Sequence, residues 1–106
     1  MKQEIRVKNE VDEKGNPAGG TVRGIGIQID WQNGPLGRGA DRMEPNGAFV
    51  EGVLEAVRQR MEFYECSEFS CPQNTWAMHH IQMALHWLEA RTANREMRQV
   101  EGTHMV

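Results

Sequence analysis

The amino-acid sequence predicts an α+β protein in which an N-terminal antiparallel β-sheet is followed by a C-terminal antiparallel hairpin of two helices. Apolar residues recur at every second position over 21–31, as in a half-buried strand. In the second half of the chain they recur every three or four positions, as on one face of a helix. With 106 residues, the chain is expected to be a single domain, β-rich over 1–45 and helical over 46–106.

Two strands are expected over 3–9 and 21–31, each with alternating apolar and polar residues. Ile25 and the apolar residues that follow it at alternate positions are expected to face the core. The segment 10–20 is polar and contains glycine, proline and acidic residues, a composition typical of a hairpin loop, so the strands should pair antiparallel. A short third strand is expected near 36–43.

The first helix is expected to begin after Asn46, which is a good N-cap residue. The second is expected to begin at Ser70-Cys71-Pro72-Gln73, which has the Ser-x-x-Gln pattern of a capping box, and to end near Gln99. The predicted helices have roughly 17 and 27 residues, so the second extends some three turns beyond the first. An apolar overhang of this length favours cover by a second copy of the chain, and we expect a homo-oligomer.

Composition and charge limit the classes of function. The chain has 12 basic and 15 acidic residues, a net charge of −3, which counts against a DNA-binding protein. Nine of the 12 bases are arginine, which grips phosphate bidentately and favours a small anionic ligand. No apolar run is long enough to span a membrane, and the chain does not begin as a signal peptide, so a cytoplasmic location is expected.

Three arginines near the end of the second predicted helix form the strongest local pattern. Spacings of four and three place Arg91, Arg95 and Arg98 on one face, where guanidinium groups can converge on a phosphate. The alternative is a solvated face that favours the helix dipole and pairs with Glu96 or Glu101.

Tyr64 and Asn74 flank the predicted helical loop, where they offer a stacking surface and an amide. Asn74 and Arg91 are 17 residues apart, about 25 Å along a helix, too far to serve one small ligand in one chain. Either they belong to different sites, or antiparallel pairing of two chains brings them together.

Neither catalysis nor metal binding is indicated. Cys66, Cys71, His79 and His80 lack the usual spacings of zinc ligands, and the two cysteines are interpreted as free thiols. No common nucleophile or metalloprotease motif occurs. We therefore expect no catalytic residues, metal or cofactor.

Three blocks carry a family resemblance. WQNGP at 31–35, FSCPQN at 69–74 and above all ALHWLEART at 84–92, continued through Arg95 to VEGTH at 100–104, resemble the phage Thoeris anti-defence type one family. The resemblance implies the helical hairpin shared with anti-CBASS sponges and a protein that is not an enzyme. It further implies sequestration of glycocyclic ADP-ribose, the signal made by TIR-domain proteins, and assembly into a dimer and a hexamer. In some members, cyclic oligonucleotides bind a separate site formed by several protomers.

Matched by motif, Arg91 and Arg95 would hold the ligand's phosphates, Tyr64 would stack on adenine, and Asn74 would be the polar residue that begins the second helix. Arg38 is matched in the loop that follows the first block. The expected ligand-binding residues are Arg38, Tyr64, Asn74, Arg91, Arg95, Arg98 and Thr103.

The sequence thus predicts a phage anti-defence protein that binds glycocyclic ADP-ribose, and also cyclic di- or trinucleotides, in the infected cell without degrading them. The alternative is a helical-hairpin adaptor that binds another protein and no nucleotide.

Overall fold

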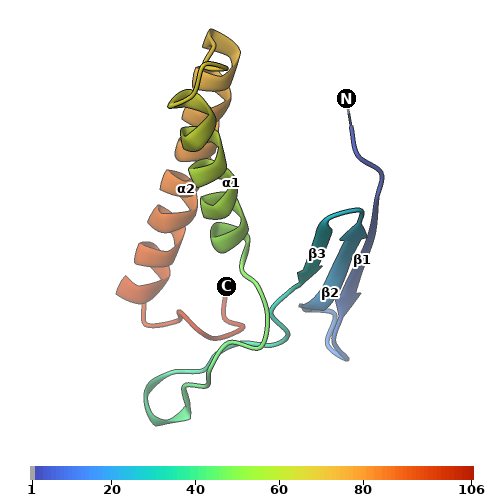
Figure 1. Cartoon of the computed structure of the whole chain (residues 1–106). Helices are drawn as coiled ribbons and strands as arrows, with labels where there is room; N and C mark the ends of the chain where they lie inside the picture. Colours follow the sequence, from blue (N-terminus) through green and yellow to red (C-terminus); the bar gives the residue numbers. More distant parts are fainter. Residues whose placement is uncertain (1) are drawn as a thin grey trace. The chain divides into compact units, whose positions relative to one another are not determined.

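The computed structural model describes residues 2–106, which form two compact units. The first unit runs to Phe49 and also includes Val100–Val106, and the second is Val50–Gln99. The first contains the sheet and the second contains the helices (Figure 1). The fold is therefore α+β, as predicted.

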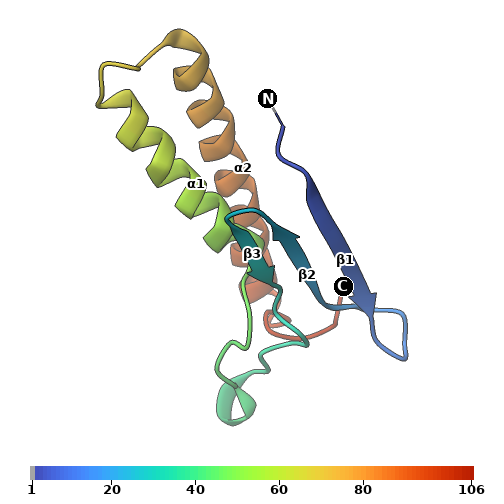
Figure 2. The same ribbon diagram turned by 45° about the vertical axis from the view of Figure 1, so that its right-hand side comes forward.

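Three strands form one antiparallel sheet in the order β1 (Ile5–Val11), β2 (Pro17–Gly24) and β3 (Ile27–Asp30) (Figure 2). The β1–β2 connection is shorter than the loop expected over 10–20. Asp12 closes it by accepting hydrogen bonds at Oδ1 from the backbone N–H groups of Lys14 and Asn16, both at 2.9 Å.

The prediction of one continuous strand over 21–31 is wrong, because the chain reverses between β2 and β3. Gly26 adopts a φ of +74°, which suits glycine in a tight turn. Ile25 lies at this turn and is 92% exposed, so the expectation that it faces the core is also wrong. The apolar period of two continues through the turn and conceals the reversal.

The third strand expected near 36–43 is also absent from the part of the chain that the structure describes. That segment contains a 3₁₀ turn, η1 (Gly39–Asp41). Met43 N–H donates a hydrogen bond to Leu36 O at 2.7 Å, which closes the loop. Positive φ angles of +85° at Gly37 and +59° at Gly39 suit this curled backbone.

The two faces of the sheet differ in polarity. Val7, Val22 and Ile29 lie opposite one another across the three strands, and Arg6, Arg23 and Gln28 follow the same register on the other face. Within residues 2–106, the buried apolar side chains are Val22 and Val100, 7% and 8% exposed. The core of the first unit is therefore small.

The second unit is an antiparallel hairpin of α1 (Val50–Glu65) and α2 (Pro72–Met97), as predicted (Figures 1 and 2). The predicted caps are wrong. Asn46 precedes α1 by four residues and instead exchanges two hydrogen bonds with the backbone of Asn33. The N-cap of α2 is Cys71, which makes no side-chain cap, and its N–H donates to Glu65 of α1 at 3.3 Å.

Candidate functional site

The C-terminal tail and the 37–42 loop are joined within the first unit. Gly37 N–H donates to Gly102 O at 2.8 Å, and Arg38 Nη1 donates to the carbonyl oxygen of Glu101 at 3.1 Å. Arg42 Nη1 bonds Glu101 Oε2 at 2.7 Å. We call this contact between 37–42 and 100–103 the tail clasp. It brings together two of the residues expected to bind ligand, Arg38 and Thr103.

Thr103 faces the tail itself, because its hydroxyl donates to Val100 O and accepts from Met105 N–H. The clasp therefore holds the side chain of Arg38, a residue that is otherwise exposed, on the Glu101 carbonyl oxygen, and the Thr103 hydroxyl is engaged within the tail. Local sequence gives no signal for this contact, since its two segments lie some 60 residues apart.

The expected phosphate-binding arginines lie on the last turns of α2. Arg91 and Arg98 are exposed and Arg95 is half-buried. Arg98 Nε donates to Asn94 Oδ1 at 3.0 Å. The regular helix through Met97 places Arg91 and Arg95 on one side, and Arg98 follows as the C-cap residue.

Tyr64 and Asn74 lie at the opposite end of the hairpin, where α1 ends and α2 begins. Asn74 Nδ2 donates to Phe69 O at 3.4 Å, which holds the amide against the loop. Arg60 Nε donates to the Tyr64 hydroxyl at 3.1 Å, and its guanidinium carbon lies 5.0 Å from the Tyr64 ring centroid and 5.1 Å from that of Phe63. The ring that was expected to stack on adenine is thus held by a cation–π contact.

Sequence reasoning missed Arg60 and Phe63 at this end. The spacing of four between Arg60 and Tyr64 was an available signal, because such residues are neighbours on a helix. Phe63 lies outside the apolar stripe of α1 and is 62% exposed, which marks it as an aromatic side chain without a core role in one copy.

A groove between the helices is lined by acidic residues and has a volume of about 450 Å³. Its lining residues are Glu51, Gly52, Glu55, Leu85, Glu89 and Thr92. Arg58 donates to both carboxylate oxygens of Glu55, at 2.7 and 2.9 Å, and lowers the pKa of Glu55 to about 2. Glu55 therefore stays ionised, so this groove is unsuited to a phosphate.

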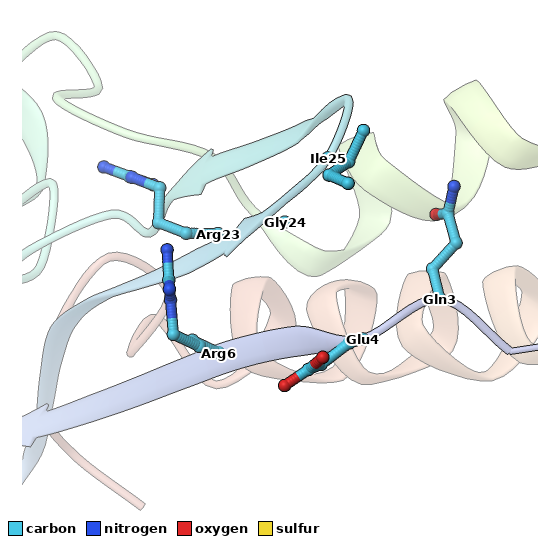
Figure 3. A pocket seen from close by; sticks show the side chains of 6 residues that line it. All are labelled: Gln3, Glu4, Arg6, Arg23, Gly24 and Ile25. Carbon is cyan, nitrogen blue, oxygen red and sulfur yellow. The ribbon is translucent and has the colours of Figure 1, made fainter.

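The sheet carries a second hollow, of about 490 Å³, on the surface around Arg6 and Arg23 (Figure 3). These arginines are directly opposite in the β1–β2 register. Arg23 Nη2 bonds Asp30 Oδ1 at 2.6 Å and lowers the pKa of that carboxyl, while Arg23 Nη1 donates to Val22 O and Ile29 O. No role was assigned to these arginines from the sequence.

One side of α2 exposes large apolar residues. Trp76 and Trp87 are 63% and 66% exposed, and Met83 lies between them, also exposed. We call these three residues the α2 face; their spacings of seven and four are those of a coiled-coil seam. His79 and His86 make edge contacts with Trp76 and Trp87, with ring centroids 5.8 and 5.5 Å apart.

The amino-acid sequence is similar to that of a curated phage protein. The chain is 38% identical over 76 residues, 72% of its length, to "Thoeris anti-defense 1" of Bacillus phage SBSphiJ7. This similarity supports membership of the Thoeris anti-defense family. The chain spans about half, 51%, of the length of this relative. No family model matches the chain.

The expected ligand-binding residues of this chain fall into three groups. Tyr64 and Asn74 lie at one end of the helical hairpin, the three arginines lie at the other end of α2, and Arg38 and Thr103 belong to the tail clasp. Asn74 and Arg91 are 17 positions apart on one continuous helix, which separates them by about 25 Å within one chain. Among residues 2–106, no group of three or more His, Cys, Asp or Glu side chains could hold a metal ion, and neither helix is long and apolar enough to cross a membrane.

Proposed function

We propose that this protein counters a bacterial defence against phage. It would do so by sequestering glycocyclic ADP-ribose intact, in the cytoplasm of the infected cell, at a site shared between two copies. The observation that carries the proposal is the placement of the α2 face between the two groups of expected ligand residues. An exposed helical face with this spacing is a surface on which a second helix packs.

The position of the α2 face favours antiparallel pairing of two α2 helices. Met83 and Trp87, two of the three residues of the α2 face, are centred on Leu85, which lies next to the midpoint of Pro72–Met97. Pairing about this centre sets Met83 of each copy opposite Trp87 of the other, and the helices overlap along their whole length. The first turn of one α2, which bears Asn74, then lies beside the last turns of the other, which bear Arg95.

Charge supports the same arrangement. The hairpin end carries Glu62, Glu65 and Glu68 with one arginine, Arg60. The end of α2 carries Arg91, Arg95 and Arg98 with one glutamate, Glu96. Antiparallel pairing places the acidic end of each copy next to the basic end of the other, whereas parallel pairing places like charges together.

The shared site would combine the chemistry that a cyclic ADP-ribose needs. The α2 arginines of one copy supply guanidinium groups for the diphosphate, and Tyr64 of the other supplies a ring for the purine. Arg38 and Thr103, both in the first unit, are further residues predicted to bind the ligand. With protein in excess, a dissociation constant near 1 nM, about −12 kcal/mol, would hold the signal below a level that an effector senses.

The hollow around Arg6 and Arg23 supports a second part of the proposal, the binding of cyclic di- or trinucleotides. Arg6 on β1, beside the Asp30-paired Arg23 on β2, offers a guanidinium group that suits a phosphodiester. The α2 face also favours the alternative function, an adaptor that packs against another protein and binds no nucleotide.

One experiment separates these functions. The purified protein is incubated with glycocyclic ADP-ribose, freed of unbound ligand and heat-denatured, and the released material is analysed. Intact ligand supports sequestration, a changed product indicates an enzyme, and no retention favours the adaptor. Arg95→Ala should abolish retention without changing the mass of the assembly measured by light scattering. Arg58→Ala, which removes an arginine paired with Glu55 and Glu62 on α1, is the matched control and should retain the ligand.

A further inference from the structure

Strand β1 presents an open edge. It pairs with β2 on one side, and no strand within residues 2–106 pairs with its other side. All seven of its residues are exposed, including Val7 at 54% and Val11 at 68%. An exposed edge strand that carries apolar side chains is a template for pairing with another strand.

The charges along β1 select one partner and one register. When two identical strands pair antiparallel about Asn9, Lys8 of each lies opposite Glu10 of the other, and Val7 lies opposite Val11. Arg6 then lies opposite Asp12, just beyond the strand. Within one copy Lys8 Nζ already lies 3.4 Å from Glu10 Oε1. The register sets two such ion pairs side by side with opposite charges facing each other, and such pairs stabilise neighbouring strands.

The neighbouring registers lack this complementarity. Pairing about Lys8 sets Lys8 opposite itself, and pairing about Glu10 sets Glu10 opposite itself. Pairing about Val7 sets Arg6 opposite Lys8. Like charges directly opposite one another destabilise a strand pair.

We propose that β1 is a second self-association surface, at which the β1 strands of two copies pair antiparallel about Asn9. Burial supports the same partner. Val7 continues the apolar row of Val22 and Ile29, yet it is exposed where Val22 is buried. Val11 of the second copy covers Val7 and extends this apolar row into a six-stranded sheet.

The β1 edge belongs to the first unit and the α2 face to the second. Because they are different surfaces, a chain that uses both forms assemblies larger than a dimer. The β1 contact does not depend on a nucleotide, so its test is independent of the proposed function.

Disulfide trapping tests the register. Val7→Cys, Lys8→Cys and Asn9→Cys are each made in the full chain with Cys66→Ser and Cys71→Ser, and are oxidised under mild conditions. Directly opposed residues on paired antiparallel strands have Cα atoms about 4.5–5.5 Å apart, within the range of about 4.4–6.8 Å that a disulfide spans. Asn9→Cys should therefore form the cross-linked dimer, and the other two should remain monomeric on a non-reducing gel. Preferential cross-linking at position 7 or 8, equal cross-linking at all three, or none at position 9 overturns the proposal.

Charge reversal tests the pairing without a cross-link. Glu10→Lys and Lys8→Glu each create two like-charge pairs, and each should weaken association about tenfold in analytical ultracentrifugation. The double variant restores opposite charges and should restore association. Glu13→Lys makes the same change in the β1–β2 turn, outside the strand, and serves as the control. A double variant that associates as weakly as the single ones, or a control that weakens equally, refutes the β1 pairing.

Discussion

Replacing Gly102 with alanine is expected to open the tail clasp. Gly102 has a φ of +79°, and a Cβ there would lie within van der Waals conflict of the Gly37 carbonyl oxygen and 3.0 Å from Arg42 Nη1. A left-handed backbone costs an alanine about 1–2 kcal/mol. Relief of the clash separates Gly37 N–H from Gly102 O, a hydrogen bond worth about 1 kcal/mol. We therefore expect the free energy of unfolding of the first unit to fall by about 2–3 kcal/mol.

Gly15→Ala is the matched control, because Gly15 also has a positive φ, +82°, but an added Cβ meets no atom within 4 Å. The control should therefore lose only the cost of the backbone conformation. Hydrogen exchange of the Gly37 amide reports directly on the clasp, and urea denaturation gives the free energy of unfolding. If Gly102→Ala destabilises the protein no more than Gly15→Ala and leaves the Gly37 amide protected, the clasp does not hold the tail.

Three further predictions concern the helices. The pKa of Glu55 is about 2 in the folded chain against an ordinary 4.5, so its stabilising effect is complete above pH 4.5 and lost as the pH falls toward 2. In acid titration followed by circular dichroism, the stabilities of wild type and Glu55→Gln should therefore converge at the acidic end. A constant difference in stability would contradict the assignment. Trp87→Ser should lower the mass of the assembly in sedimentation, whereas Phe63→Ser, a similarly exposed aromatic on α1, should not, and equal effects would exclude a specific α2 face. Tyr64→Leu should weaken ligand binding at least about tenfold in calorimetry, since stacking of a base on an aromatic side chain contributes about 1–3 kcal/mol. Unchanged affinity would remove Tyr64 from the site.

The helices were predictable because their signal is local and repeats several times. The apolar spacing and the proline in the first turn place α2 close to its observed Pro72–Met97. The sheet was harder to predict, because the alternation that indicates a strand continues through the Ile25–Gly26 turn. Asn46 has the composition of a helix cap, but its side chain bonds the backbone of Asn33 instead, a tertiary contact that outweighs a local preference.

The candidate site also has parts that local sequence predicts and parts that it does not. Helical spacing alone places Arg91 and Arg95 on one side of α2, and the short loop brings Tyr64 and Asn74 to one end of the hairpin. The tail clasp joins segments that are remote in sequence, so its hydrogen bonds have no local pattern. The hold of Arg60 on Tyr64 also depends on side-chain rotamers, which spacing permits but does not determine.

The small buried core gives a physical reason for a site that is shared between chains. Neither α1 nor α2 buries a residue completely, and within residues 2–106 the buried apolar side chains are two valines of the first unit. Apolar area that one copy leaves exposed on the α2 face and on the β1 edge is stabilised only when another surface covers it. Association then supplies burial that the short chain lacks, and in the proposed pairing it also brings Asn74 and Arg95 within reach of one ligand. Assembly and ligand binding would in this way depend on the same contacts, so that a change on the α2 face alters both, whereas a change in Arg95 alters binding alone.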